Sequence, residues 1–505
     1  MRDSQSSDSA ALDLGRAARS TAFALGMTAI GLGSNYLFNI AVAHWFGPAD
    51  FGLFAAGYAL LNALAIVVVL GLDAIVLREA AGARARGDMA SARAILRRAA
   101  FLVLLAGCAI GGGLALAARP ITASFFAATP GIAPVLQAFA PALPAIAVGT
   151  VLLAGLQAIQ DVRVRLLLRY GLDPLLRFGF GALAYALGAS ILGAVAAVAA
   201  ASAATALGAL AAFHRLAARQ ATAVAASVAT IGWLGLLGAS WPLTGAALFN
   251  LAAMRSDTLI LLSLTGAHEV GLYSAALMTA AMITILLMVV ETIMSPLFAD
   301  RIARTGIGSI GPLFRLSLRW VTLLAVPAFL FFAIAAPEIM GLFGAEFRAA
   351  APAFVLLSAA ALVNCLTGSA NYVLILSGKT KLVLANSVVY AAAVIVANYV
   401  AIREWGILGA ATAMLATTIA LNLARLVEVS VLFRVHPFSR ASAWPVGIGA
   451  AIWAGAALLQ DRLSDAATWP IAAAAVLIHA AVLLAVGLDP ADRRLLGRAL
   501  ATVRR

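Results

Sequence analysis

The chain of 505 residues is 64% hydrophobic and only 11% charged, whereas a soluble domain has roughly 45–50% apolar and about 25% charged residues. This composition excludes a water-soluble globular protein, because too few polar side chains remain to cover its surface. The net charge is +13, which in a soluble protein would raise the question of a nucleic-acid partner. Here the basic residues fall in short loops between apolar runs, and we expect no such partner.

Apolar runs long enough to cross a bilayer, about 20 residues each, follow one another along the sequence. In chain order the predicted spans are 20–44, 53–77, 99–118, 135–160, 174–192, 194–213, 240–264, 271–296, 316–336, 351–376, 382–402, 408–433, 444–460 and 470–488. The predicted fold class is therefore an all-α polytopic membrane protein with about 14 transmembrane helices.

The positions of Lys and Arg predict how these helices are oriented, because basic residues collect in cytoplasmic loops. With a cytoplasmic N-terminus, the cytoplasmic segments hold 28 of the 34 basic residues, and Arg177 and Arg255 fall within spans. The outer loops hold only Arg119, Arg348, Arg403 and Arg462. The distribution of positive charge thus indicates the orientation of the helices in the membrane, and both termini are predicted to be cytoplasmic.

The two halves of the sequence repeat one another at a nearly constant offset. The segment from Gly47 to Phe54 lies over the segment from Gly266 to Tyr273, and three further matches follow in the same order. The further matches are Ala133-Pro134 over Ala351-Pro352, Arg163 over Lys381, and 191–194 over 407–410. Matches that keep both their order and their spacing indicate an internal duplication.

Each repeat contains six predicted spans, an even number, so the two copies have the same orientation in the membrane. Two parallel six-helix bundles around a central cavity are the expected arrangement, with alternating access by rocking of one bundle against the other. The predicted domains are a cytoplasmic tail (1–19), an N-terminal bundle (20–223), a C-terminal bundle (224–435), two additional helices (436–488) and a basic cytoplasmic tail (489–505).

Several motifs resemble the bacterial polysaccharide (oligosaccharide) flippases, a Wzx-like family of the multidrug/oligosaccharidyl-lipid/polysaccharide (MOP) exporter superfamily. The first half carries them in the segments 34–39, 46–54 and 71–79, and the second half in 255–257, 270–276, 343–344 and 406–411. The resemblance covers about residues 20–435. It implies two V-shaped bundles, with helices 1, 2, 7 and 8 lining the cavity.

The resemblance also implies a function. The expected activity is translocation of an undecaprenyl-diphosphate-linked oligosaccharide from the cytoplasmic to the periplasmic leaflet of the bacterial inner membrane, for exopolysaccharide, capsule or O-antigen synthesis. The implied partners are the lipid-linked oligosaccharide, membrane lipids and a polysaccharide polymerase with a chain-length regulator. The alternatives are a cation-coupled multidrug exporter and the lipid II flippase of the same superfamily.

Polar side chains inside apolar spans are costly and mark candidate sites. On helix one, Asn35 and Asn39 share a face and Tyr36 is adjacent; on helix ten, Asn364 and Asn371 share a face by their seven-residue spacing. Amides and a phenol can bind sugar hydroxyls, and they can equally form hydrogen bonds to a neighbouring helix. These five residues are therefore candidates for the substrate cavity.

Helix seven carries three further candidates, Asn250, Arg255 and Asp257. Asn250 and Asp257 are seven residues apart and share a helix face, whereas Arg255 points elsewhere. An Arg in the cavity would bind a diphosphate through bidentate hydrogen bonds, and an Arg in a packed interface would pair with an acid. Both interpretations of Arg255 stay open.

Three acidic residues suggest further roles. Asp73 and Glu291 lie at equivalent positions of the two repeats and are a hypothetical pair that gates access or titrates during coupling. The alternative is that each pairs with a cytoplasmic Arg, such as Arg78 or Arg301. Asp173 lies four residues before Arg177, a spacing that lets the two pair on one helix face.

Other chemistries find no support in the sequence. A P-loop motif is missing, so ATP is not bound in that way, and the loops are too short for a catalytic domain, which argues against a membrane-embedded polymerase or ligase. Cys108 and Cys365 lie inside apolar runs, and His44, His268 and His479 lack metal-ligand spacing. We therefore expect no enzyme activity, no cofactor and no metal site.

Overall fold

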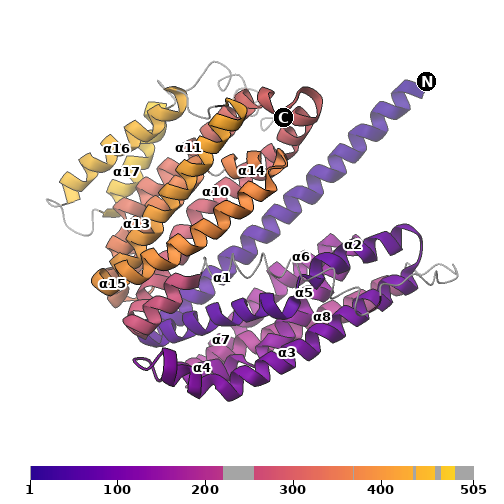
Figure 1. Ribbon diagram of the computed structural model, residues 1–505, viewed down its shortest axis with the longest axis horizontal. Coiled ribbons are helices and arrows are strands. Elements are labelled where there is room, and N and C mark those ends of the chain that lie inside the picture. Colours follow the sequence, from indigo (N-terminus) through magenta and orange to yellow (C-terminus); the bar gives the residue numbers. More distant parts are fainter. Residues whose placement is uncertain are drawn as a thin grey trace. The chain divides into compact units, whose positions relative to one another are not determined.

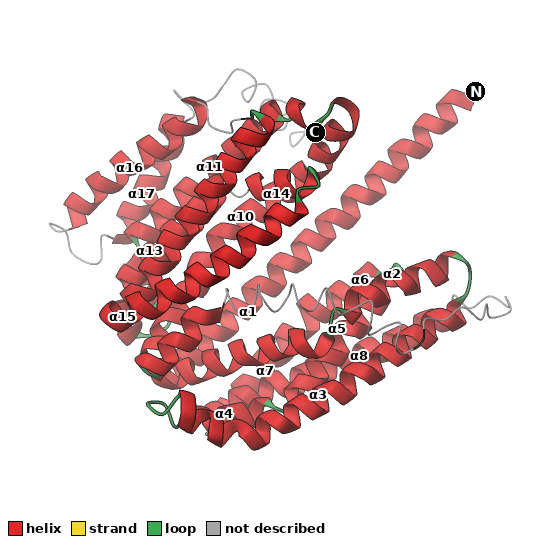
Figure 2. Cartoon of the chain, in the orientation of Figure 1, coloured by secondary structure: helices red, strands yellow, loops and turns green. Residues whose placement is uncertain are grey.

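The computed structural model describes residues 2–219, 232, 255–367, 369–435, 440–460 and 468–483. Within these ranges nearly every residue is helical and no β-strand occurs (Figures 1 and 2). The predicted all-α fold class is confirmed. The chain divides into two compact units: unit 1 comprises Met1–Ala252 and Gly266–Gly271, and unit 2 comprises Ala253–Thr265 and Leu272–Arg505. The bundle boundary predicted at 223 and 224 lies outside the described residues.

Unit 1 is organised around α5, which packs against α8, α3, α2 and α1 (Figure 1). Its elements are α1 (Arg2–Val69), α2 (Leu72–Ala85), α3 (Met89–Phe125), α4 (Ile132–Phe139), α5 (Ala142–Ala158), α6 (Val162–Leu166), the π-helix η1 (Leu167–Leu172), α7 (Asp173–Ala186) and α8 (Ile191–Arg219). The long α1 is two helices joined at Gly47, whose φ of 77° and ψ of 174° are not helical. Pro48 then begins the second helix, where its missing N–H costs nothing.

Unit 2 contains the helix at 255–264 and the elements that follow it. These are α10 (Ala267–Thr305), η2 (Ile307–Ser309), α11 (Gly311–Ile334), α12 (Ala336–Gly341), η3 (Ala345–Ala350), α13 (Ala351–Thr367), α14 (Ser369–Leu376), α15 (Thr380–Phe433), α16 (Arg440–Gln460) and α17 (Thr468–Val482). The first residues of α10, up to Gly271, belong to unit 1. α15 is two helices joined at Gly406, and α11 packs against α13, α16 and α17.

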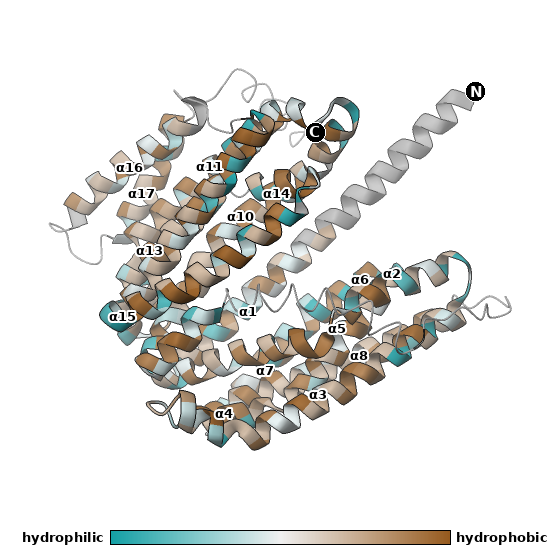
Figure 3. Cartoon of the chain, viewed as in Figure 1, coloured by the Kyte–Doolittle hydropathy of each residue, from teal (hydrophilic) through white to brown (hydrophobic). Residues whose placement is uncertain are grey.

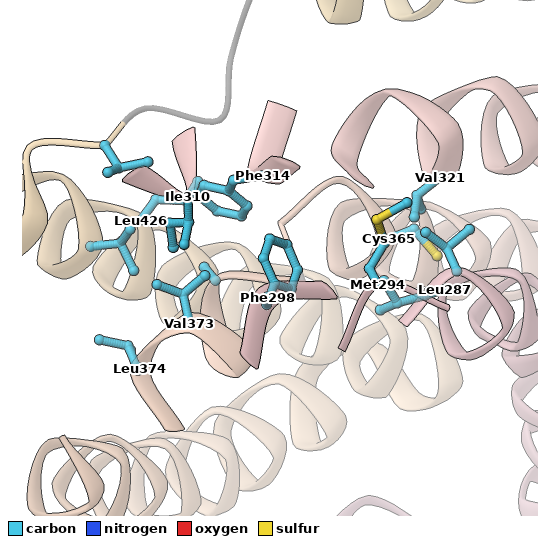
Figure 4. Packing of buried hydrophobic residues seen from close by; sticks show 14 of the residues in the cluster. Leu287, Met294, Phe298, Ile310, Phe314, Val321, Cys365, Val373, Leu374 and Leu426 are labelled. Carbon is cyan, nitrogen blue, oxygen red and sulfur yellow. The ribbon is translucent and has the colours of Figure 1, made fainter. Parts of the chain in front are cut away.

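The hydrophobic core of unit 2 joins α10, α11, α13, α14 and α15 (Figure 4). Phe298 of α10 and Phe314 of α11 are almost completely buried there, together with Val373 of α14. Cys365 of α13 also lies in this core, where its thiol donates to the carbonyl oxygen of Ile283 at 3.4 Å. Both cysteines are free thiols. The sequence predicts both as small core residues, but Cys108 of α3 is exposed and only Cys365 is buried.

The surface of both units is apolar, as a bilayer requires. Leu116, Val431 and Leu477 are 85%, 73% and 68% exposed, and hydrophilic residues concentrate at helix ends such as the turn after α2 (Figure 3). Seven of the described helices are long and apolar enough to cross a membrane, or eight when the bent pair α4 and α5 counts as one span. Because α1 and α15 each join two helices, these numbers do not fix the crossings, and fourteen stays a prediction.

The backbone repeats along with the sequence. Four residues of the first half with a positive φ have counterparts in the second half at nearly the same offset as the residue matches, each where one helix ends and the next begins. The pairs are Gly47 and Gly266, Gly87 and Gly306, Gln160 and Gly378, and Gly188 and Gly406. Turn geometry of this kind is set locally, so its recurrence supports the duplication independently of the residue matches.

Close packing of α3 on α5 gives a stability prediction. A Cβ atom added at Gly107 would lie 2.7 Å from the Cα of Pro144, whereas one added at Gly112 meets nothing within 4 Å. We expect Gly107→Val to destabilise the protein by about 1–3 kcal/mol, the usual effect of overpacking, and Gly112→Val to leave it unchanged. Thermal unfolding in detergent measures both, and equal midpoints for the two variants would contradict this packing.

Candidate functional site

The polar face of α1 is partly engaged inside unit 1. The Asn39 amide nitrogen donates to the backbone oxygen of Asn35 at 2.7 Å, so one of its hydrogens is already bound within the helix. Gly31, one turn before Asn35, packs against Tyr170 of η1, where an added Cβ would lie 2.6 Å from the tyrosine Cβ. Asn35 and Tyr36 are half-buried. The side-chain amide of Asn35 therefore stays a candidate for hydrogen bonding to a cargo.

A buried ion pair lies at the centre of unit 1. Arg177 and Asp173, both in α7, pair at 2.9 Å with side chains only 7% exposed, which confirms the pair expected from their spacing. Arg177 also donates to the phenolic oxygen of Tyr58 in α1 at 2.8 Å, and its guanidinium lies over the Tyr58 ring. Thr205 of α8 donates to Asp173 at 3.4 Å. The cluster thus connects three helices of the unit.

Beside this cluster lies a small cavity of about 10 Å³, the space of about one water molecule. It lies between α5, η1 and α8, and Arg169, Asp173, Ser202 and Thr205 are among its lining residues. The hydroxyl of Ser202 is buried and has no hydrogen-bond partner within the described part of the chain. Because Asp173 and Thr205 of the ion-pair cluster line it, the cavity is part of the polar interior of unit 1.

In unit 2, Asp257 is held by three donors. Tyr273 donates its hydroxyl to one carboxylate oxygen at 2.8 Å, and the amide and hydroxyl of Thr258 donate to the other at 2.6 and 3.1 Å. Asp257 is 5% exposed. Its carboxylate therefore serves the interior of unit 2, while Arg255, two residues earlier, is half-buried. Asn250, the third candidate on this helix, lies outside the described residues.

Two asparagines of α15, Asn398 and Asn422, are also buried. Asn398 donates to the Ser256 hydroxyl at 3.3 Å, but its own amide oxygen has no partner among the described residues. Asn422 is 1% exposed, and neither polar atom of its side chain has a partner in the same ranges. A buried amide without a partner costs about 1–3 kcal/mol. These two side chains are thus polar features that packing alone does not explain.

The remaining predicted site residues are Asn364, Asn371, Asp73 and Glu291. Asn364 in α13 and Asn371 in α14 are half-buried, and the Asn371 amide oxygen has no partner in the described ranges. Asp73 lies in the first turn of α2 in unit 1, and Glu291 lies half-buried in α10 in unit 2. Their pairing stays a prediction. Arg78, the alternative partner of Asp73, instead donates to Glu79 at 2.8 Å.

The described residues contain no group of three or more His, Cys, Asp or Glu side chains that could hold a metal ion. The polar clusters instead combine single carboxylates with hydroxyl and amide groups, Asp173 in unit 1 and Asp257 in unit 2. Such clusters hold helices together and can bind polar groups.

Residues 17–301, more than half of the sequence, match a family described as polysaccharide biosynthesis protein. The chain belongs to this family. The comparison with curated proteins finds no matching sequence. The family match covers nearly all of unit 1 that the structure describes and the helices that carry Asp257, Tyr273 and Glu291 in unit 2.

Solved structures show which fold this family member has. It is similar to the lipid II flippase MurJ in an inward closed conformation, with a TM-score of 0.67 and 12% identity over 92% of this chain and 98% of that one. It is also similar to an inward-facing multidrug resistance transporter of the MATE family, with a TM-score of 0.63 and 14% identity over 79% and 94%. A MOP superfamily transporter from Pyrococcus furiosus matches with a TM-score of 0.54 and 17% identity over 82% and 94%.

These similarities show that the protein has the fold of the MOP superfamily transporters, as the sequence motifs suggested. It is a multi-pass membrane protein, and the solved structures that it resembles are transporters.

Sequence reasoning missed Tyr58, Thr205 and Tyr273 of the two polar clusters. It also missed the buried amides of Asn398 and Asn422. For Asn398 and Asn422 a signal was present, because each is an amide inside an apolar span. Tyr58 and Tyr273 gave none, since a single tyrosine in an apolar run is ordinary. Their partners lie 119 and 16 residues away in the sequence.

The ion pair of unit 1 gives a second stability prediction. Arg177→Gln leaves the Asp173 carboxylate buried without its cation, and we expect a loss of about 3–5 kcal/mol. Adding Asp173→Asn should recover part of this loss, because the buried charge is then removed as well. The exposed pair Arg304 and Asp300, at 2.7 Å and also four residues apart, is the matched control, and Arg304→Gln should cost less than about 1 kcal/mol.

Apparent unfolding free energies of the three variants in detergent measure these effects. An Arg177→Gln variant as stable as Arg304→Gln would show that the cluster does not support unit 1.

Proposed function

We propose that this protein is a flippase that moves an undecaprenyl-diphosphate-linked oligosaccharide from the cytoplasmic to the periplasmic leaflet of a bacterial inner membrane. The product would serve exopolysaccharide, capsule or O-antigen synthesis, with a polysaccharide polymerase and a chain-length regulator as downstream partners. The family match over residues 17–301 is the observation that carries the proposal.

Two further observations support it. The fold extends over 92% of the chain in the comparison with a lipid II flippase, a protein whose name states a lipid-linked cargo. The basic residues favour a cytoplasmic N-terminus and C-terminus, an orientation in which cargo built in the cytoplasm enters from the basic side. Phosphate groups are attracted to such a side by its Arg residues.

The mechanism we propose is alternating access. Polar side chains facing the cavity would replace water around the glycan, while the lipid tail stays in the bilayer. Arg255 is the candidate for the diphosphate, because it is half-buried within a span and a guanidinium binds phosphate oxygens in a bidentate manner. Asn35, Tyr36, Asn364 and Asn371 are candidates for sugar hydroxyls.

Two related functions compete with this proposal. A multidrug resistance transporter shares the fold, and so does the lipid II flippase, so the fold itself does not separate the cargos. The polysaccharide biosynthesis family match favours a glycan intermediate over a drug.

The cargo prediction is tested in liposomes that contain the purified protein and an undecaprenyl-diphosphate-linked oligosaccharide with a fluorescent sugar. We expect protein-dependent movement of the sugar to the opposite leaflet, measured by its accessibility to an added membrane-impermeant quencher. Arg255→Gln should slow this movement about tenfold or more, in line with the loss of one strong charge-assisted contact. Arg304→Gln, an exposed arginine in the same unit, is the control.

Movement of lipid II or efflux of a cationic dye at rates above that of the oligosaccharide would replace the proposed cargo by one of the two alternatives. Equal rates for Arg255→Gln and Arg304→Gln would exclude Arg255 from cargo binding.

A fourth prediction concerns Asp73 and Glu291, which we propose to gate access or to take part in ion coupling. The double variant Asp73→Asn with Glu291→Gln keeps both side-chain shapes but removes both charges. We expect it to abolish polysaccharide export in cells at normal protein level, because the proposed role in gating or coupling depends on the carboxylate charges. Unchanged export would reject the pair, and Glu79→Gln on the same helix as Asp73 is the control.

A further inference from the structure

One helix of unit 1 changes its hydrogen-bond pattern part-way along. Residues 162–186 are helical without a break, but the pattern passes from α-helical in α6 to π-helical in η1 and back to α-helical in α7. At the end of η1 the amide of Asp173 donates to the carbonyl oxygen of Leu168, five residues earlier, whereas an α-helix would use Arg169. Short π-turns of this kind are rare and are found frequently at functional sites.

Pro174, the second residue of α7, explains this pattern. Proline has no amide hydrogen, so position 174 cannot donate to Tyr170, its α-helical partner, or to Arg169, its π-helical partner. The amide of Asp173, the last donor before the proline, is already bound to Leu168. The helix is therefore held by fewer backbone hydrogen bonds at this point than in the regular turns on either side.

The part of the helix after the π-turn is firmly attached to the rest of unit 1. Asp173, its first residue, pairs with Arg177 at 2.9 Å and accepts a hydrogen bond from Thr205 of α8. Arg177 also donates to Tyr58 of α1. Breaking a buried ion pair is costly, so α7 should keep its place when the protein changes conformation.

The part before the proline is attached much less tightly. In α6 only Leu166 is buried, and in η1 no residue is buried, whereas α7 buries four residues. Apolar contacts hold this part to its neighbours, such as Leu168, whose side chain would lie 3.2 Å from a Cβ atom added at Gly208 of α8. Apolar contacts can slide, because they are not directional.

The cavity of about 10 Å³ adjoins the same turn. Arg169 of η1 and Ser202 of α8 are among the residues that line it. Because protein interiors are otherwise close-packed, a helix bends most easily where such a space lies beside it. The Ser202 hydroxyl, which has no hydrogen-bond partner within the described ranges, can donate to a backbone oxygen that bending frees, as a polar group in a membrane requires.

A movement of η1 would extend to α1. Tyr170 lies so close to Gly31 that a Cβ atom added at the glycine would be 2.9 Å from the tyrosine Cα. Segments whose backbones are in contact move together, so this part of α1 would follow η1. Asn35, a candidate for sugar hydroxyls, lies one turn further along α1.

We propose that η1 is a hinge, about which residues 162–172 swing relative to α7 in each transport cycle. The swing carries the part of α1 next to Tyr170 with it, while the ion pair of α7 stays intact. Residues 162–172 extend over about 16 Å, so a bend of about 20° moves their far end by about 5 Å. The role in transport rests on the proposed function, but the hinge itself does not depend on the cargo.

The first experiment measures the swing with spin labels in lipid nanodiscs, in a chain whose two native cysteines are replaced. One pair, at Arg97 and Val162, joins α3 to the start of the swinging part. The other pair, at Leu116 and Leu183, joins α3 to α7, and all four side chains are exposed. We expect the first distance distribution to be broader than the second by about 5 Å, or divided into two peaks.

The second pair is thus the control for the motion of the labels themselves. Equal widths for the two pairs would overturn the hinge. Both pairs leave Pro174 and η1 unchanged, so this result does not depend on how a hinge variant folds.

The second experiment stiffens the hinge. Pro174→Ala restores a backbone donor and lets an α-helix run through η1, and alanine favours a helix interior more than proline does, so the amount of folded protein should not fall. We expect the Arg97 and Val162 distribution to narrow to the width of the second pair. We also expect movement of the oligosaccharide per folded protein to slow about fivefold or more.

Pro120→Ala is the matched control, because Pro120 also lies inside a helix of unit 1, in the regular α-helix α3. It should change neither the distances nor the transport rate. A Pro174→Ala protein with a narrowed distribution and an unchanged transport rate would overturn the role of the hinge in transport. If the unmodified protein moves no oligosaccharide, the proposed cargo fails, but the distances still decide on the hinge.

Discussion

The structure depends on one constraint, which is that a polar group surrounded by hydrocarbon must find its partner inside the protein. For the backbone the helix meets this demand, and every described transmembrane segment is helical. For side chains the demand is met by gathering them inside each unit. Arg177, Asp173 and Tyr58 form such a group in unit 1, and Asp257 with Tyr273 and Thr258 forms another in unit 2.

The same constraint separates two kinds of polar residue that look alike in the sequence. Asp257 and Arg255 are both charged residues in an apolar span, and insertion scales assign each about 2.5–3.5 kcal/mol. In the structure Asp257 receives three hydrogen bonds and is buried, so its cost is offset within unit 2. Arg255 is half-buried, which makes it the better candidate for an external anion such as a diphosphate.

Much of the fold could be predicted from the sequence, because helices in a membrane are a local property. Apolar runs located the helices, and the match of Gly47–Phe54 with Gly266–Tyr273 located a duplication that the backbone repeats at Gly47 and Gly266. The pair of Asp173 and Arg177 was predictable as well, since both residues lie on one helix and their spacing sets the distance.

The contacts between helices were not predictable in this way. Periodicity shows which residues share a face, but not which face of another helix lies opposite. Tyr58 is hydrogen-bonded to Arg177, 119 residues away in the sequence, and Asn398 to Ser256, 142 residues away. Contacts between residues so far apart cannot be inferred from the local sequence pattern. Spacing places Asn35 and Asn39 on one face of α1, but it does not show that the Asn39 amide donates to the backbone oxygen of Asn35.

The strengths of these contacts differ enough to suggest where the protein moves. Removing one partner of a buried ion pair such as Arg177 and Asp173 costs about 3–5 kcal/mol, whereas a Cα–H to carbonyl contact between closely packed helices contributes about 0.5–1 kcal/mol. A conformational change follows the path that breaks the weaker contacts. The ion-pair cluster of unit 1 should therefore stay intact while weaker contacts separate.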